Sequence, residues 1–188
     1  YNEETIRIRN APDEIVIISD TEWGPILRPD HDDTPLALAW TALHPEAVNL
    51  KLIELEHAQT ADEATRIAQH TGIPVQNFIV GDRSGTIGWT LAGRIPARAS
   101  GYDPQISADW TLPNTGWNGW LPPDRYPLIL DPDSQRLWSA NSRPVSGSQL
   151  ALLGNGGYDL GARASQIRDQ LFAREQFEPT HMRAIQLD

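Results

Sequence analysis

One polar side chain interrupts the apolar face that residues 75, 77 and 79 share in a predicted strand, and its amide is a candidate for chemistry. Asn77 lies between Val75 and Ile79 and shares a strand face with both. Because an amide buried without a partner costs about 1–3 kcal/mol, its presence has a cause. The structural interpretation is an amide bonded to neighbouring backbone. The functional interpretation is an N–H donor aimed at an oxyanion that develops during catalysis.

A second candidate follows in the segment Gly-Arg-Ile-Pro-Ala-Arg at residues 93–98. Arg98 carries a planar guanidinium that can bind a carboxylate or a carbonyl group with several donors. It is interpreted either as an arginine that anchors a surface loop or as one that orients catalytic groups or substrate.

Other residue patterns allow three further kinds of site. Two clusters contain residue types that bind metals. The first is the acidic loop with His31, Asp32 and Asp33, and the second contains Glu54, Glu56 and His57. Neither cluster has an established zinc spacing. Solvated acidic surface is the alternative interpretation, because charged residues are mostly exposed. The sequence therefore predicts no metal site in this chain.

Ser84 lies in a Gly-Asp-Arg-Ser-Gly segment that superficially resembles a nucleophile elbow. That elbow requires Gly-x-Ser-x-Gly on a strand-to-helix turn, whereas this serine is one place late and its turn joins two strands. Paired carboxylates for glycoside hydrolysis are defined by their separation in space, which the sequence does not give. The seven tryptophans could stack on sugars, although tryptophan more often anchors a core or a loop.

Length and composition set the limits of these interpretations. The 188 residues suit one domain or subdomain over residues 1–188, and a net charge of −10 argues against nucleic acid and anionic lipid as partners. The sequence contains no apolar run of about 18 residues, so no membrane-spanning helix is predicted. Cysteine is absent, so no disulfide framework is expected. The chain starts at Tyr1 without a methionine, which we interpret as a processed chain or a piece of a longer protein.

The elements that position Asn77 and Arg98 are a helix and a hairpin. Thr60 and Glu63 match a capping box, which predicts a helix from residue 60 to a stop near Gly72. Asp82-Arg83-Ser84-Gly85 then suits a tight turn between two strands, with Gly85 at positive φ. In the returning strand, residues 87, 89 and 91 should share one face.

The remaining segments favour an α+β fold with a mainly antiparallel sheet. Strands are predicted at residues 4–9, 14–19, 36–41, 126–130 and 136–140, with the second more buried, and a helix at residues 162–174. Residues 50–57 are ambiguous between helix and strand. Residues 96–127 are rich in proline, glycine and tryptophan and are predicted to form a long ordered loop on the body of the protein.

The hairpin also resembles a known enzyme family. Residues 74–89 are similar to the motif Gln-Asn-x-x-x-Ala-Asp-x-x-Gly-Asn-Ile-Gly-Tyr in the β chain of penicillin acylases, and Gly-x-Ile-Pro-x-Arg follows at residues 93–98. Five other segments resemble motifs of the family in the right order; they are residues 21–26, where Trp23 replaces a histidine, 38–43, 117–122, 139–144 and 163–171.

The resemblance implies a portion of an αββα N-terminal-nucleophile hydrolase sandwich. In that family the N-terminal Ser of the β chain attacks an amide, and its own α-amine acts as base. By motif position, Asn77 matches the oxyanion-hole asparagine and Arg98 the active-site arginine. No cofactor is expected in this chain. A calcium ion is possible in the complete protein, with Asp82 as a candidate ligand.

The resemblance also implies what this chain lacks. Tyr1 has no hydroxyl placed like that of serine, so we expect no nucleophile here and no activity of the chain alone. The α chain and the rest of the β chain would be its partners, an acyl amide the substrate of the complete protein, and the periplasm or the exterior its compartment. Open strand edges could also give a homo-oligomer.

Two alternatives to an acylase portion stay open. One is a non-catalytic α+β binding module that uses the Trp- and Pro-rich loop at residues 100–127. The other is a structural subdomain without a site.

Overall fold

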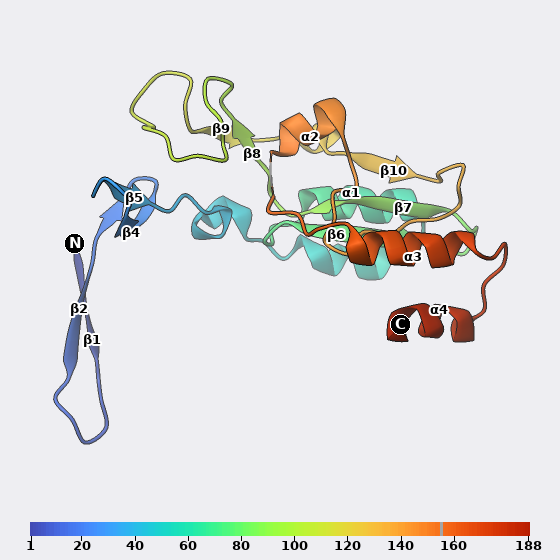
Figure 1. The fold of residues 1–188 in the computed structure, drawn as a ribbon, viewed down its shortest axis with the longest axis horizontal. Coiled ribbons are helices and arrows are strands. Elements are labelled where there is room, and N and C mark those ends of the chain that lie inside the picture. Colours follow the sequence, from blue (N-terminus) through green and yellow to red (C-terminus); the bar gives the residue numbers. More distant parts are fainter. Residues whose placement is uncertain (155) are drawn as a thin grey trace. The chain divides into compact units, whose positions relative to one another are not determined.

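The computed structural model describes residues 1–154 and 156–188, which form two compact units, Tyr1–Val48 and Asn49–Asp188. Helices combine with small antiparallel sheets, so the predicted α+β class is confirmed (Figure 1). The single domain or subdomain expected over residues 1–188 stays a prediction. Within the described ranges, no helix is both long and apolar enough to cross a bilayer.

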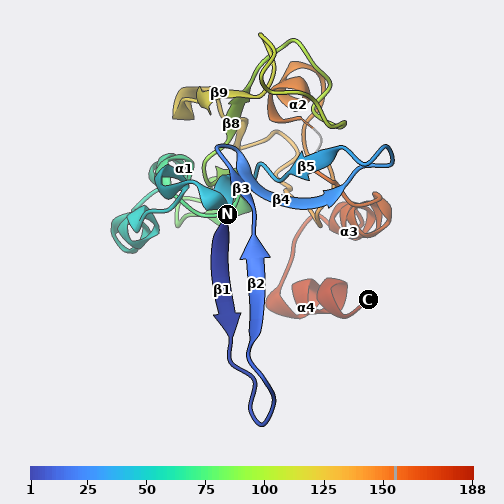
Figure 2. The same cartoon turned by 90° about the vertical axis from the view of Figure 1, so that its left-hand side faces the viewer.

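The first unit consists of short strands followed by two turns of 3₁₀ helix. Strands β1 (Asn2–Ile6) and β2 (Glu14–Ile18) form an antiparallel ribbon whose two strands lie side by side (Figure 2). A small sheet follows, in the order β3 (Asp20–Thr21), β4 (Gly24–Pro29) and β5 (Pro35–Ala37), and the 3₁₀ helices span Thr41–Leu43 and Pro45–Ala47.

Two predictions for the first unit are wrong. The strand expected to be buried is open to solvent, with Ile15 64% and Ile17 62% exposed. Pairing in a two-stranded ribbon satisfies the backbone along one edge but covers neither face, so the β-branched side chains stay uncovered. The strand expected at residues 36–41 ends at Ala37, because the chain turns into the 3₁₀ helix at Thr41.

The second unit is built around a three-stranded sheet in the order β10 (Leu128–Leu130), β7 (Ile87–Ala92) and β6 (Gln76–Gly81). The predicted hairpin is confirmed, and Ile79 of β6 lies opposite Trp89 of β7. At its turn, the Gly85 N–H donates to the carbonyl of Asp82 at 3.1 Å, and Gly85 has a φ of 94°.

Helix α1 (Ala61–His70) confirms the helix predicted from its capping signal. Thr60 Oγ1 accepts a hydrogen bond from the Glu63 N–H at 3.2 Å. The reciprocal half differs from expectation, because the Glu63 carboxylate accepts from the Gln59 N–H at 2.8 Å. This first turn is therefore capped by two side chains.

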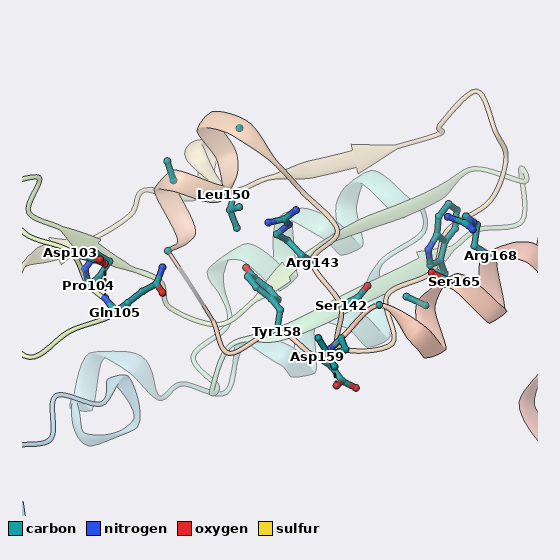
Figure 3. Close-up of a pocket in the computed structure, with 17 residues that line it drawn as sticks. Asp103, Pro104, Gln105, Ser142, Arg143, Leu150, Tyr158, Asp159, Ser165 and Arg168 are labelled. Carbon is teal, nitrogen blue, oxygen red and sulfur yellow. Dashed lines mark hydrogen bonds between the residues drawn. The ribbon is translucent and has the colours of Figure 1, made fainter.

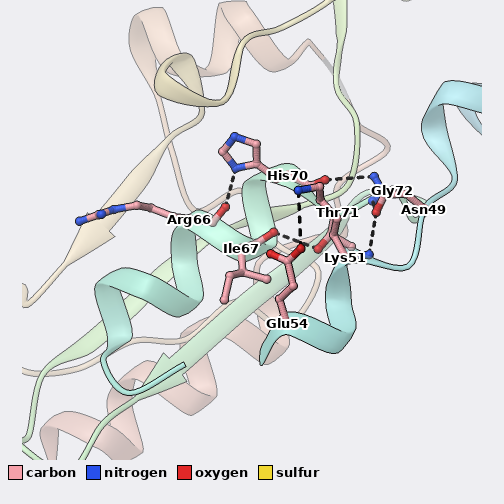
Figure 4. Close-up of polar contacts among 8 residues, drawn as sticks. All are labelled: Asn49, Lys51, Glu54, Arg66, Ile67, His70, Thr71 and Gly72. Atoms are coloured by element: carbon pink, nitrogen blue, oxygen red, sulfur yellow. Dashed lines mark hydrogen bonds and ion pairs between the residues drawn. The ribbon is translucent and has the colours of Figure 1, made fainter. Parts of the chain in front are cut away.

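The other end of α1 is tied to the segment that precedes it, around Asn49 (Figure 4). Asn49 Nδ2 donates to the carbonyl of His70 at 3.1 Å, while its Oδ1 accepts from the Gly72 N–H at 2.8 Å. The helix ends at His70 with Thr71 as its C-cap, directly before the expected glycine at residue 72. Residues Lys51–His57, which were ambiguous from sequence, form a 3₁₀ helix.

The two faces of the sheet are covered differently. On one face, α1 packs against β7, and buried Gln69 donates from Nε2 to Thr90 Oγ1 at 3.1 Å. That hydroxyl in turn donates to the carbonyl of Pro127 at 2.8 Å, which links helix and sheet to the segment before β10. The opposite face carries the hydrophobic core, made of Trp89, Ile95, Leu121, Tyr126, Val145 and Leu153.

The long segment expected to be an ordered loop contains a small hairpin. Strand β8 (Pro96–Arg98) pairs with β9 (Trp117–Trp120), and the pairing continues past β8 through a hydrogen bond from the Ala99 N–H to the carbonyl of Gly116 at 2.9 Å. Trp110 and Trp117 lie with ring centroids 5.5 Å apart. The 3₁₀ helix Pro123–Arg125 leads on to β10. The segment therefore contains strand pairing and an aromatic contact of its own.

The C-terminal part is helical. Helix α3 (Ala162–Phe172) confirms the predicted helix, with Ala164 and Leu171 buried. The sequence reading missed α2 (Gly147–Leu153) and α4 (Pro179–Leu187). The strand predicted at residues 136–140 is wrong, because Gln135 and Ala140, with φ of 50° and 51°, interrupt extended backbone at both ends.

Asp82 links the hairpin turn to the start of α1, which gives a test of the fold. One carboxylate oxygen accepts from the Ala61 N–H at 2.9 Å, and the other from the Ser84 N–H and hydroxyl and from the Thr86 N–H. These bonds, led by that of the Ser84 hydroxyl, hold the pKa of Asp82 below its usual range. An Asp82→Ala variant should therefore have a lower melting temperature at pH 7.

The pH dependence follows from the direction of this shift. Because the folded pKa lies below the unfolded value of about 3.9, the stabilisation is complete above that pH and is lost as pH falls through the folded pKa. Thermal unfolding followed by circular dichroism should show that the melting temperatures of the variant and the wild type converge as the pH falls into the acid range. The exposed Asp133→Ala serves as control, and an equal effect of both substitutions at pH 7 would contradict this role.

Candidate functional site

Asn77 lies on an open part of the sheet with its amide held in one orientation. Its Oδ1 accepts a hydrogen bond from the indole Nε1–H of Trp89 at 3.0 Å. Its Nδ2 group makes no hydrogen bond to the residues that the structure describes. Strand β6 is at the edge of the sheet, and Ile79, two residues further on the same face, is 48% exposed. The amide N–H groups are therefore available at the surface.

Trp89 is the partner that the sequence reading did not identify. Its side chain is 1% exposed and belongs to the hydrophobic core. A buried indole N–H needs an acceptor, and Asn77 provides it. The signal in the sequence was the predicted shared face of residues 87, 89 and 91, but the pairing of Ile79 with Trp89 comes from the strand register.

Arg98 lies at the end of β8 and is half-buried. Its Nη1 donates to the carbonyl of Leu153, the last residue of α2, at 2.7 Å. A Cβ placed on Gly154 would lie 3.3 Å from the guanidinium carbon, so glycine leaves room for this contact. Burial lowers the pKa of Arg98, and Tyr102 and Tyr158 oppose that shift. Burial of the tyrosine hydroxyls raises the pKa of both Tyr102 and Tyr158.

Tyr126 holds the loop that joins β7, which carries Trp89, to β8, which carries Arg98. Its buried hydroxyl accepts from the Ile95 N–H at 3.1 Å and donates to the carbonyl of Gly93 at 2.9 Å. Gly93 has a φ of 111°, and a Cβ there would lie 2.5 Å from the carbonyl oxygen of Ile73. Only glycine fits this close approach, which sets where the chain leaves β7 toward Arg98.

A cleft of about 840 Å³ lies in the C-terminal part of the second unit. Figure 3 shows Arg143, Tyr158 and Leu150 around its middle, with Gln105 toward one end and Arg168 toward the other. Neither Asn77 nor Arg98 lines it. Its link to the candidate site is Gly154, which lines the cleft and lies against Arg98.

The two predicted site residues therefore belong to one unit but have separate anchors. Asn77 is held by the core through Trp89, and Arg98 by the end of α2. No hydrogen bond joins them in the described part of the chain. Their catalytic roles stay predictions.

The structure also describes the surroundings of the other candidate residues, which are the acidic loop, Asp82 and Ser84. Ligand atoms of Asp30, His31 and Asp32 lie within 4.8 Å of one another, and the His31 and Asp32 side chains are exposed. His31 Nδ1 lies 3.0 Å from Asp30 Oδ1. The expected absence of a metal site stays a prediction. Both oxygens of Asp82 accept hydrogen bonds, one from α1 and the other from the turn, and its role as a calcium ligand stays a prediction. The Ser84 hydroxyl donates to Asp82 at 2.6 Å and lies in the hairpin turn.

Comparisons with known proteins identify a family over the whole chain. A family model described as penicillin amidase matches residues 1–188. The penicillin acylase 2 proenzyme of a Pseudomonas species is 26% identical over 196 residues, which is 100% of this chain and 24% of that protein. Penicillin G acylase of Escherichia coli is 30% identical over 148 residues, 76% of this chain and 17% of that protein.

A third relative has a different named activity. The acyl-homoserine lactone acylase QuiP of Pseudomonas aeruginosa is 26% identical over 199 residues, 99% of this chain and 23% of that protein. This chain thus spans a quarter or less of the length of these curated relatives.

The solved structure of a thermostable penicillin G acylase from Alcaligenes faecalis superposes with a TM-score of 0.75 at 20% identity, covering 95% of this chain and 32% of that one. The chain thus has the fold of part of that enzyme, as predicted.

Tyr126→Phe tests how the loop before Arg98 is held. Removing the hydroxyl leaves the buried N–H of Ile95 and the carbonyl of Gly93 without their partner, which should cost about 1–3 kcal/mol. Urea denaturation measures this as a lower midpoint with an unchanged slope. Tyr102→Phe is the control, since its hydroxyl makes one 3.3 Å bond at a less buried position. A larger effect of the control would contradict the role of Tyr126.

Proposed function

The chain belongs to the penicillin amidase family, and we propose on that basis that the complete protein hydrolyses a linear amide between an acyl group and an amine. The observation that carries this proposal is the exposed Asn77 amide on an edge strand, whose Oδ1 accepts from Trp89 while its Nδ2 makes no hydrogen bond to the described residues. The family match over residues 1–188 supports the same assignment.

The proposed reaction passes through an acyl-enzyme. A serine Oγ at the N-terminus of a chain portion outside these residues attacks the amide carbon, and its proton passes to the serine's own α-amine. The carbonyl oxygen becomes an oxyanion that accepts from Asn77 Nδ2. The C–N bond then breaks as the amine leaves with that proton. Water attacks the resulting ester and releases the acid and the serine.

In this proposal, Arg98 orients the groups around the nucleophile from the side of α2. Its guanidinium uses Nη1 on the carbonyl of Leu153 and has further donors on the same planar group. Because it is half-buried and anchored, it can hold a polar partner in a fixed direction.

The proposed partners are the remaining segments of the same enzyme. One relative is named a proenzyme, which supports a precursor that is cut into chains. Secretion to the periplasm or the exterior is part of the proposal, tested by fractionation of cells that express the complete gene.

The relatives name two substrate classes, a penicillin and an acyl-homoserine lactone. Both contain an acyl group joined to an amine by a linear amide. We therefore propose an acyl amide as substrate, with penicillin G and N-hexanoyl homoserine lactone as the first compounds to test.

The alternative of a binding module on residues 100–127 has less support. Trp110 and Trp117 contact each other, and Gly116 packs against the Trp110 ring, which a Cβ would approach to 2.9 Å. These aromatic rings order the loop itself.

Asn77→Ala in the complete enzyme tests the oxyanion role. Losing one such donor should lower kcat by about 10²–10³ with little change in KM, because the bond forms only in the transition state. Steady-state kinetics on the panel amides measures this. Gln76→Ala, the exposed neighbour on the other face of β6, should leave kcat unchanged. A wild-type kcat in Asn77→Ala would remove Asn77 from the mechanism.

The isolated chain of residues 1–188 should show no turnover of any panel amide. An oxyanion donor lowers the barrier of an attack, but Tyr1 supplies no serine hydroxyl beside an α-amine. The assay compares purified chain and complete enzyme at equal concentration. If the isolated chain turned over an amide, and if Asn77→Ala abolished that turnover, this account of the nucleophile would be overturned.

A further inference from the structure

We propose that Trp89 is a positioning residue for catalysis, because its indole N–H selects the orientation in which the Asn77 amide presents Nδ2–H to the substrate. This inference rests on the proposed oxyanion role of Asn77. Trp89 itself touches neither substrate nor reacting atoms in this scheme.

The strand register brings the two side chains together. Trp89 lies opposite Ile79 on β7, and Asn77 is two residues from Ile79 on β6, so Trp89 and Asn77 are diagonal neighbours on one face. Such neighbours are within reach when one of them is aromatic. The resulting bond from Nε1 to Oδ1 is 3.0 Å long.

The chemistry of the two groups makes this contact selective. An indole N–H only donates, whereas an amide has one acceptor oxygen and one donor nitrogen. Rotating the Asn77 amide by half a turn would set its NH₂ against the indole N–H, and two donors cannot bond. The contact therefore favours Oδ1 toward Trp89 and leaves both Nδ2 hydrogens directed away from it.

Burial makes the indole a fixed reference point. Trp89 is 1% exposed and packs with Ile95, Leu121 and Tyr126 in the core. On the other side of the strand, a Cβ on neighbouring Gly88 would lie 3.2 Å from Thr65 of α1, so helix and sheet are in close contact there. β7 is thus held from both faces.

Asn77 lacks comparable restraint of its own. It is exposed on an edge strand, and within the described residues its side chain has no other hydrogen bond. Without the indole N–H, the amide could adopt both orientations and several rotamers. Only a fraction of molecules would then present the donor correctly.

The sharpest test replaces one atom of Trp89 in the complete enzyme. Site-specific incorporation of benzothienylalanine puts sulfur in place of the indole N–H and keeps the size and shape of the ring. We expect kcat to fall about fivefold to tenfold, the equivalent of one neutral hydrogen bond, with KM unchanged. Penicillin G and N-hexanoyl homoserine lactone are the probe substrates.

A double-variant cycle separates positioning from packing. If Trp89 acts through Asn77, benzothienylalanine in an Asn77→Ala background should cause no further loss of kcat. Val145→Ala is the control for a loosened core, since Val145 is in the same cluster but not part of the site. It should lower the melting temperature and leave kcat unchanged. Trp89→Phe is a genetically encoded second variant that also lacks the N–H.

The outcomes distinguish this inference from the function on which it rests. If Asn77→Ala lowers kcat but both Trp89 variants keep wild-type kcat, or lower it equally in the Asn77→Ala background, the positioning role is overturned and the oxyanion role stands. If Asn77→Ala keeps wild-type kcat, or the wild type cleaves neither probe, the oxyanion role is overturned and the positioning role falls with it.

Discussion

The indole of Trp89 connects the hydrophobic core of the second unit to the polar group at its open edge. Its ring is almost fully buried, so its N–H had to find an acceptor close by, and the edge strand supplies one in Asn77. A single hydrogen bond thereby satisfies a buried donor and orients an exposed amide. The candidate site depends on this bond, because the remainder of Asn77 is in contact with solvent.

Two further sets of contacts support that arrangement from opposite sides of the sheet. Gln69 and Thr90 join α1 to β7 and reach the carbonyl of Pro127, while the Tyr126 hydroxyl spans the loop from Gly93 to Ile95. Buried polar groups of this kind fix geometry, because any displacement leaves a donor or acceptor unpaired. These buried polar contacts therefore help to place the strand opposite Asn77 and the loop toward Arg98.

The local elements were predictable where one short segment contains the whole physical cause. The helix after Thr60 and the turn at Gly85 depend on residues within a few positions of each other, and both form as expected. One of the failures has a non-local cause. The strand at residues 14–19 forms but stays uncovered, since burial depends on what packs on it. The strand expected at residues 136–140 is replaced by irregular backbone between two residues of positive φ.

The sequence by itself determined the α+β class, the hairpin and, through its ordered motifs, the enzyme family, and it proposed Asn77 and Arg98 as site residues. Local patterns carry this information, because capping, turn chemistry and strand alternation depend on near neighbours. Only the tertiary structure decided that Trp89 holds Asn77, that Leu153 anchors Arg98, and that Asp82 is used by a turn and a helix. These partners lie 12, 55 and 21 residues apart, and such pairings follow from strand register and packing, which no local segment contains.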